Sequence, residues 1–538
     1  MVVPSFVMQL FDTNFTSLDW CIVVAYLLIS IVVGIWANRY VGNIAGYLVA
    51  GRTLRIRLAL ATMTGTEIGL VTVMYSAELG FTQQYASLYL ALYELVILLF
   101  IGLTGVVVYR MRQSKVLTIP EYYEKRYSRG VRVLGGVMMV TSGVLNMGLF
   151  LKAGSLFLIS ITGLGLGEEL GLKLIMTGLL LLVLFYTVLG GMVSVVITDL
   201  IQFVILGSAM VIVTLFVVNE VSIDGFAEVV TQHNGYFDPT SIDNPSTEKP
   251  DDGIGPITLT AQFVVLSVAL MLWPTGASRT LAVKTPEIAR KLYLCSTIPF
   301  LARRSLPVLW GIGAFAFFHS HPGLNEQFQT AIAAGGDINT QAAMPLFLAK
   351  IIPSGLLGLV TAGMVAAFMS THDSYLLCWS GVITQDVVAP LMKNGLTEKQ
   401  RILTTRVAIV ATGIMLLVWG LWYEVSSNLW QYMAVTGTVY LAGVFPVVIG
   451  GLYWSRSSSA GAYIALLGGL TGIMALVPCT EFLNKQIARA GFDMALRSEH
   501  VMLGSFAFSL LGFIVGSLLL PDDRPTESSD TIGQEENQ

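Results

Sequence analysis

Charged residues are scarce in this chain. Asp, Glu, Lys and Arg make up 12% of its 538 residues, whereas hydrophobic residues make up 54%. Soluble domains carry roughly 25% charged residues, so a chain this poor in charge cannot cover a water-facing surface. Lipid is therefore the expected solvent for most of it. If each span uses about 20 apolar residues, a dozen or so spans take up roughly half of the chain. The composition predicts an all-α polytopic membrane protein.

Other functional groups are also missing. The four cysteines have no paired spacing, which excludes a disulfide framework or a cysteine metal site. No HExxH motif and no recognisable pair of catalytic aspartates is present, so we expect no enzymatic activity and no organic cofactor. The net charge of −4 is too small to suggest a nucleic-acid partner, and nothing indicates a protein partner. The N-terminus lacks the basic region of a cleaved signal peptide.

Long apolar runs are abundant instead. Windows of about 19 residues predict thirteen transmembrane spans, of which the eighth is the weakest because Arg303 and Arg304 lie inside it. The predicted spans are 18–38, 58–79, 85–109, 131–160, 172–189, 192–218, 256–273, 292–318, 354–379, 402–423, 430–454, 460–477 and 501–520. They form one membrane domain over residues 1–520, followed by an acidic tail at 521–538 that we expect to be disordered.

The distribution of basic residues predicts the orientation. With thirteen spans and the N-terminus outside, 23 of the 30 Lys and Arg residues fall on the cytoplasmic side and six on the outer side. Arg279, Arg303 and Arg304 are counted on the cytoplasmic side. The positive-inside rule then places the N-terminus outside and the C-terminus in the cytoplasm, in a plasma or inner membrane. The longest connection, 219–255, is an acidic extracellular loop with eight acidic residues and one Lys.

Two spans carry helix-breaking residues. The second contains two glycines, three threonines and a carboxylate between Thr62 and Gly69, and the seventh ends in Trp273-Pro274-Thr275-Gly276. Proline removes a backbone donor and glycine weakens a helix. Interrupted segments at matching places in two halves indicate a transporter binding site. The spans then form five-helix inverted repeats, about 57–218 and 256–454, with one helix before them and two after. Alternatively, glycine and proline only permit close helix packing.

Hydroxyl groups form a stripe on the ninth span. Ala367, Ser370, Thr371 and Ser374 share one helix face at i, i+3, i+4 and i+7. Two hydroxyls and a carbonyl are hard oxygen ligands without fixed charge, which suits a weakly held Na⁺. The remaining ligands would be carbonyls of the broken second span, with Gly65 and Ile68 as candidates. Alternatively, these hydroxyls only bond to the carbonyls of their own helix.

Five ionisable residues lie inside predicted spans: Glu67, Glu94, Lys152, Asp199 and Asp373. Such residues are costly in a membrane and are functional hypotheses by default. The alternative for Lys152 is a structural ion pair with Glu94 or Glu67.

Four passages, at 51–54, 186–202, 278–284 and 366–377 followed by Asp386, resemble the solute:sodium symporter family. The resemblance implies a LeuT-like fold and Na⁺-coupled symport of a small organic solute by alternating access, with Na⁺ as coupling ion. It also implies a main Na⁺ site formed by the carbonyls of Gly65, Ile68 and Ala367 and the hydroxyls of Ser370 and Thr371.

Some relatives have a second sodium site, which would fall here on Asp199, Ser370, Asp373 and Ser374. The sequence departs from these relatives at Asp373, where they have a small hydroxyl residue. The extra carboxylate could tighten a cation site or accept a proton, so the number and identity of the coupled ions stay open.

We expect the substrate near the membrane midplane, between Thr66 and Glu67 of the second span, Asn146 and Lys152 of the fourth, and Trp273 and Thr275 of the seventh. Its class is a sugar, an amino acid or an organic acid. The stretch Trp273–Ser278 lacks the Asn-, Gln- and Tyr-rich character of the sugar carriers in the family, which weakens a sugar assignment without excluding it.

Two other functions stay open. One is a proton-coupled carrier that uses Asp373 or Glu67. The other is a non-transporting membrane sensor, although the 18 residues after Leu520 are too few for an output domain.

Overall fold

The computed structural model describes residues 10–37, 44–164, 169–231, 235–245, 253–333, 338–393, 395–422, 429–492 and 495–522. Across these ranges the regular structure is helical, and the β-type pairing is a single bridge between Leu54 and Val283. The predicted tail from 523 on and part of the predicted acidic loop, 246–252, lie outside the described residues. The all-α prediction is confirmed.

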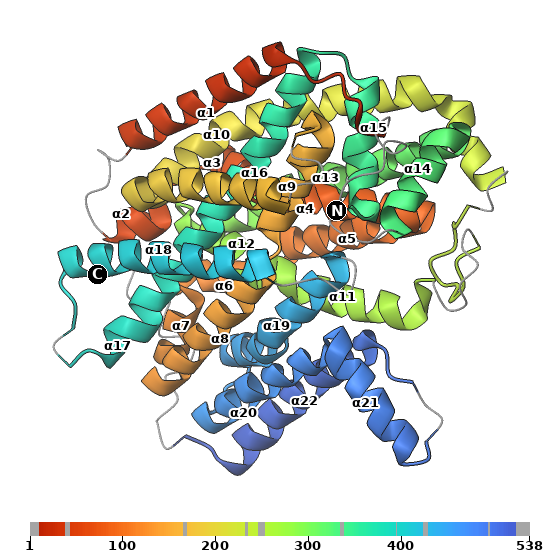
Figure 1. Cartoon of the computed structure of the whole chain (residues 1–538). Coiled ribbons are helices and arrows are strands. Elements are labelled where there is room, and N and C mark those ends of the chain that lie inside the picture. The colour runs from red at the N-terminus through yellow and green to blue at the C-terminus, as the bar shows by residue number, and fades with distance from the viewer. Residues whose placement is uncertain are drawn as a thin grey trace.

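The α-helices pack into one bundle (Figure 1). Their bounds are α1 Ser17–Ala37, α2 Ile44–Val49, α3 Ile56–Glu67, α4 Leu70–Thr82, α5 Tyr89–Thr104, α6 Val108–Gln113, α7 Ile119–Arg126, α8 Arg129–Met147, α9 Phe150–Thr162, α10 Glu169–Thr231, α11 Gly255–Leu272, α12 Pro274–Ala282, α13 Pro286–Ser320, α14 Pro322–Ala333, α15 Ala343–Ile351, α16 Leu356–Val382, α17 Ala389–Leu391, α18 Glu398–Trp422, α19 Leu429–Tyr453, α20 Ser459–Gly469, α21 Val477–Arg489 and α22 Ser498–Leu519.

In the described part of the chain, nine helices are long and apolar enough to cross a membrane, or up to eleven if each bent pair is one span. Each of the thirteen predicted spans falls on a helix, but two do not pass this test. The fifth is short, with an apolar helix at 173–185, and the eighth lies on α13 with its arginines. The number thirteen therefore stays a prediction.

The second span is broken where the sequence predicts it. α3 ends at Glu67, α4 begins at Leu70, and the two helices are bent by 57°. Gly69 leaves room for Thr371 at this break, because a Cβ atom there would lie 2.5 Å from Thr371 Oγ1 on α16 and would displace it. The glycine lets the unwound backbone approach the ninth span.

The seventh span is broken at Trp273. Its ψ of 129° is extended, so α11 ends at Leu272 and α12 begins at Pro274, which has no N–H to donate. The start of α3 and the end of α12 then meet: Leu54 N donates to Ala282 O (3.2 Å) and Lys284 N to Leu54 O (3.0 Å). At this contact α3 begins, whereas α12 ends. The broken spans therefore run in opposite directions, as inverted repeats require.

α16 is the most enclosed candidate span, with 89% of its apolar window buried. Its N-terminus is capped by Asp19 of α1, whose Oδ1 accepts from Gly355 N (2.7 Å) and Gly358 N (2.6 Å). Because α16 has almost no lipid-facing side, its polar residues need partners within the protein.

Candidate functional site

The hydroxyl stripe of α16 contacts the broken end of α3. Ser370 Oγ donates to Gly65 O (2.8 Å) and to Ala367 O (3.1 Å). Thr371 Oγ1 donates to Thr66 O (3.1 Å) and to Ala367 O (3.0 Å). All five residues are buried. Two hydroxyl and three carbonyl oxygens from two helices thus lie together without a fixed charge, which is a donor set for a weakly held Na⁺.

Four of the five residues predicted for the main sodium site are therefore brought together. The fifth, Ile68, is buried directly after α3 and its N–H donates to Thr64 O (2.9 Å). The carbonyl that contacts Thr371 belongs to Thr66 instead. Ser370 and Thr371 donate both to a carbonyl of their own helix and to carbonyls of α3. These hydroxyls therefore make the intrahelical bonds of one interpretation and also face the carbonyls of the other, in which they are Na⁺ ligands.

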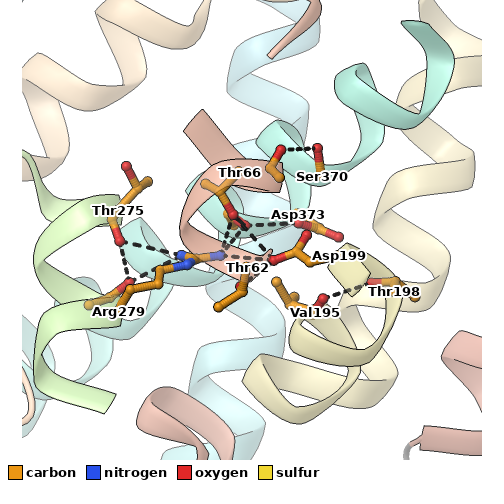
Figure 2. A network of polar contacts seen from close by, with 12 residues as sticks. Thr62, Thr66, Val195, Thr198, Asp199, Thr275, Arg279, Ser370 and Asp373 are labelled. Carbon is orange, nitrogen blue, oxygen red and sulfur yellow. Dashed lines mark hydrogen bonds and ion pairs between the residues drawn. The ribbon is translucent and has the colours of Figure 1, made fainter. Parts of the chain in front are cut away.

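A second polar network lies beside this set (Figure 2). Asp199 of α10 is fully buried, and its Oδ2 accepts a hydrogen bond from Thr62 Oγ1 and a longer one from Thr66 Oγ1 (3.3 Å). Ser374 Oγ lies 3.0 Å from Thr66 Oγ1 and 3.1 Å from Asp373 Oδ1. The structure thus groups three of the four residues of the second-site hypothesis, Asp199, Asp373 and Ser374, and adds two threonines of α3. The fourth, Ser370, bonds to Gly65 O and Ala367 O.

Arg279 is the residue of this network that sequence reasoning missed. The positive-inside count places it on the cytoplasmic side, but its side chain is 1% exposed. Its Nη2 atom donates to Ser374 Oγ (2.5 Å) and Thr66 Oγ1 (2.6 Å) and lies 3.5 Å from Asp199 Oδ2. The sequence does contain a signal for the position of Arg279. Pro274 favours the start of a helix, and Arg279 follows Thr275 by one turn of that helix.

Glu67, the last residue of α3, faces α12 and α13. Its Oε1 accepts from Thr275 Oγ1 (2.9 Å), and its Oε2 lies 3.5 Å from Arg303 Nη1. Arg303 Nη1 also donates to the Glu67 carbonyl (2.7 Å). The Glu67 side chain is 18% exposed, compared with 0% for Glu94, so it is the more accessible of the two carboxylates.

Aromatic rings line the adjacent break. Trp273 Nε1 donates to Tyr375 OH (2.8 Å), and its ring centroid lies 5.9 Å from that of Trp379 on α16. The predicted substrate residues Thr66, Glu67, Trp273 and Thr275 are therefore assembled at the two breaks. Lys152 lies half-buried on α9. Asn146 Nδ2 donates to Met433 O (2.9 Å) and Thr436 Oγ1 (3.1 Å), so this group ties α8 to α19 instead.

Glu94 of α5 binds two arginines of α13. Arg303 Nη2 lies 3.0 Å and Arg304 Nη2 2.6 Å from Glu94 Oε1, and all three side chains are buried. Arg304 also lies over the rings of Tyr75 and Trp430, at 4.9 and 4.7 Å. The count of cytoplasmic basic residues is therefore wrong for Arg303 and Arg304, which are ion-pair partners in the protein interior, as it is for Arg279.

A cavity opens between α12 and α16. Its walls include Ser278 of α12, Ser374 of α16 and the segment Leu117–Ile119 before α7. Arg112, which precedes that segment, donates to Val283 O (2.6 Å) at the end of α12. The cavity therefore approaches the polar network from the side where the two broken spans meet.

Known proteins are similar to this chain in sequence and in fold. Residues 47–470 match the model of the sodium:solute symporter family. The sodium/mannose cotransporter SLC5A10 of Bos taurus is 24% identical over 543 residues, covering 94% of this chain and 87% of that protein. The high-affinity proline transporter PutP of Bacillus subtilis (strain 168) is 23% identical, covering 94% and 100%.

A solved structure of a Na⁺-coupled sialic acid symporter, in a substrate-bound outward-open state, aligns with a TM-score of 0.75 at 18% identity, covering 94% of this chain and 99% of that one. This similarity shows the fold, which is LeuT-like. The family model extends over most of the chain, and this protein therefore belongs to the sodium:solute symporter family, as an integral membrane transporter that couples solute movement to Na⁺.

Proposed function

We propose that the main Na⁺ site lies between the broken end of α3 and the hydroxyl stripe of α16. The carbonyls of Gly65, Ile68 and Ala367 and the hydroxyls of Ser370 and Thr371 are its ligands, with the Thr66 carbonyl as a further candidate. The observation that carries this proposal is the contact of Ser370 Oγ with Gly65 O at 2.8 Å, which joins two helices at an unwound backbone. Discontinuous helices offer carbonyls to coupling ions in this way.

Coupling then follows from the position of the ion. Na⁺ bridges α3 and α16 and favours the state in which the substrate site is formed. Neutral oxygens hold the ion weakly, so it leaves readily into a cytoplasm low in sodium. The coupling free energy is the difference in ion affinity between the outward-open and inward-open states. The basic residues of the loops support an orientation with the N-terminus outside and the C-terminus in the cytoplasm.

The substrate site is proposed next to the same break, at Thr66, Glu67, Trp273 and Thr275, with Asn146 and Lys152 as further predicted contacts. Glu67 presents a carboxylate that accepts hydrogen bonds from hydroxyl or amine groups, and Trp273 presents an apolar face. The relatives are named for mannose, proline and sialic acid. We infer a small polar organic solute of the sugar, amino-acid or organic-acid class.

Binding of ²²Na⁺ to the purified protein tests the ion site. Replacing Ser370 with alanine removes one ligand and is expected to weaken saturable binding at least about tenfold, the effect of losing one hydrogen-bond-strength interaction with a charged group. Ser208→Ala is the matched control, because Ser208 also bonds to a carbonyl of its own helix, Val204 O (3.0 Å), but lies exposed on α10. Measurements at two pH values separate the rivals: the absence of sodium binding at both would contradict the proposal and favour proton coupling or a sensor.

The substrate site has a separate test. Once a sodium-driven uptake screen has identified a substrate, Glu67→Gln is expected to raise its KM about tenfold or more, since a charged acceptor is lost. Sodium binding should stay within about twofold of the wild-type value, because the side chain faces Thr275 rather than the hydroxyl stripe. Glu228→Gln, an exposed position on α10, is the control. An unchanged KM in Glu67→Gln would rule this residue out as a substrate contact.

A further inference from the structure

Arg279 lies at the position predicted for a second cation. Its Nη2 atom is within 2.5 to 3.5 Å of oxygens from Ser374, Thr66 and Asp199, which belong to α16, α3 and α10. Figure 2 shows the guanidinium of Arg279 reaching from α12 toward Thr66 and Asp199. A positively charged group thus contacts three oxygens of the kind that would bind a metal ion.

The charge at this position is permanent. Arginine is not deprotonated in proteins, and Asp199 and Arg279 are 0% and 1% exposed. A buried carboxylate that stays ionised is costly unless a cation lies next to it. A sodium ion placed on the same oxygens would lie next to the guanidinium group, and two adjacent like charges repel strongly in a medium of low dielectric constant. The oxygens can therefore hold Arg279 or a second ion, but not both together.

We propose that Arg279 is a tethered cation that takes the place of a second sodium ion and limits this transporter to one Na⁺ per cycle. The proposal rests on the proposed function, because it assumes that Na⁺ binds at the main site. It assigns to Arg279 the role of a specificity-determining residue for ion stoichiometry.

The tether also connects the two ion positions. Thr66 contributes its carbonyl to Thr371 (3.1 Å) and its hydroxyl to Arg279 (2.6 Å), so one residue of the broken helix belongs to both sets. Arg279 lies on the second broken span, whereas Thr66 and Asp199 belong to the first predicted repeat. The contact thus crosses between the repeats that move relative to each other during alternating access.

The other side of the guanidinium is bonded within its own helix. Its other amino group, Nη1, bonds within α12 to Ser278 Oγ (3.1 Å) and Thr275 O (3.4 Å). Ser278 and Ser374 both line the cavity between α12 and α16. A displacement of α12 away from α10 would separate Nη2 from Asp199 while Arg279 keeps its contacts within α12.

The number of ions bound per protein tests the proposal. Saturation binding of ²²Na⁺ to the full chain is expected to give one ion in the wild type, with a Hill coefficient near one. Arg279→Gln is expected to gain a second saturable ion, and the double variant Asp199→Asn/Arg279→Gln to return to one, because the carboxylate that holds the extra ion is gone. Arg279→Lys keeps a tethered cation and should bind one. Arg456→Gln, at an exposed position, controls for the loss of an arginine.

Each outcome has one meaning. Two ions in the wild type would overturn the proposal whether or not the variants fold. One ion in both the wild type and a folded Arg279→Gln variant would also overturn it while leaving the main site intact. No binding in the wild type would instead contradict the proposed function. The neutral double variant removes both partners of the buried pair, so it avoids the unpaired charge that could prevent Asp199→Asn or Arg279→Gln from folding.

Discussion

Glu94→Gln is expected to cause a large loss of stability, about 3–5 kcal/mol, because it removes one partner from a buried ion-pair network. Glu94 lies 3.0 Å from Arg303 and 2.6 Å from Arg304, and its side chain is fully buried. A neutral amide would leave both guanidinium groups inside the protein without this carboxylate. For Arg303 the structure describes a more distant acidic partner, Glu67, at 3.5 Å.

The damage should extend to the transport site. Arg303 also donates to the Glu67 carbonyl (2.7 Å) at the end of α3, so a displaced Arg303 would release the backbone at the break. The measurement is the midpoint of thermal unfolding in detergent, with and without Na⁺. Glu228→Gln is the control for loss of an exposed carboxylate. A midpoint equal to that of the wild type would mean that Glu94 does not neutralise the arginines of α13.

Gly311→Ala is expected to disrupt the packing of α13 on α4. A Cβ atom at Gly311 would lie 2.0 Å from Ala77 O, and one at Gly80 would lie 2.1 Å from Val308 O. Both obstacles are backbone atoms, which cannot rotate away as a side chain can. The two helices must therefore separate, at a cost of about 1–3 kcal/mol or more. α13 carries Arg303 and Arg304, so their contacts with Glu94 should weaken at the same time.

The matched control variants are expected to change the stability in the opposite direction. A Cβ atom added at Gly504 on α22 or at Gly207 on α10 would have no other atom within 4 Å, so alanine there meets open space. Alanine should stabilise these helices by up to about 1 kcal/mol through its higher helix propensity. The same unfolding measurement on Gly311→Ala, Gly504→Ala and Gly207→Ala therefore separates steric conflict from propensity. Equal midpoints for all three would show that α4 and α13 do not touch at their backbones.

The breaks in the second and seventh spans are predictable from sequence because they depend on local chemistry. Glycine and proline disfavour a continuous helix through their own position, and Gly69 and Pro274 both lie at helix starts in the structure. The stripe formed by Ala367, Ser370 and Thr371 is predictable for a similar reason, since helical periodicity alone places these residues on one face. The chemistry of the candidate sodium site follows from these two local facts.

The positive-inside count fails where basic residues have acidic partners far away in the chain. Arg303 and Arg304 appear in the sequence only as a weakness of the eighth span, yet they bind Glu94, which precedes them by 209 and 210 residues. A hydropathy window averages neighbours in sequence and contains no information about such a partner. The contact between Asn146 and α19 cannot be predicted from the sequence for the same reason.

Composition and periodicity by themselves determined that this chain lies in a membrane, where two of its spans break and which hydroxyls share one face of the ninth span. Only the tertiary structure decided what occupies the space beside Asp199. Arg279 is 80 residues from Asp199 in sequence and 95 from Ser374, and whether its side chain reaches them depends on how α12 is placed against α3, α10 and α16. That placement results from the packing of four helices, and in a low-dielectric interior it determines which cation neutralises the buried carboxylate.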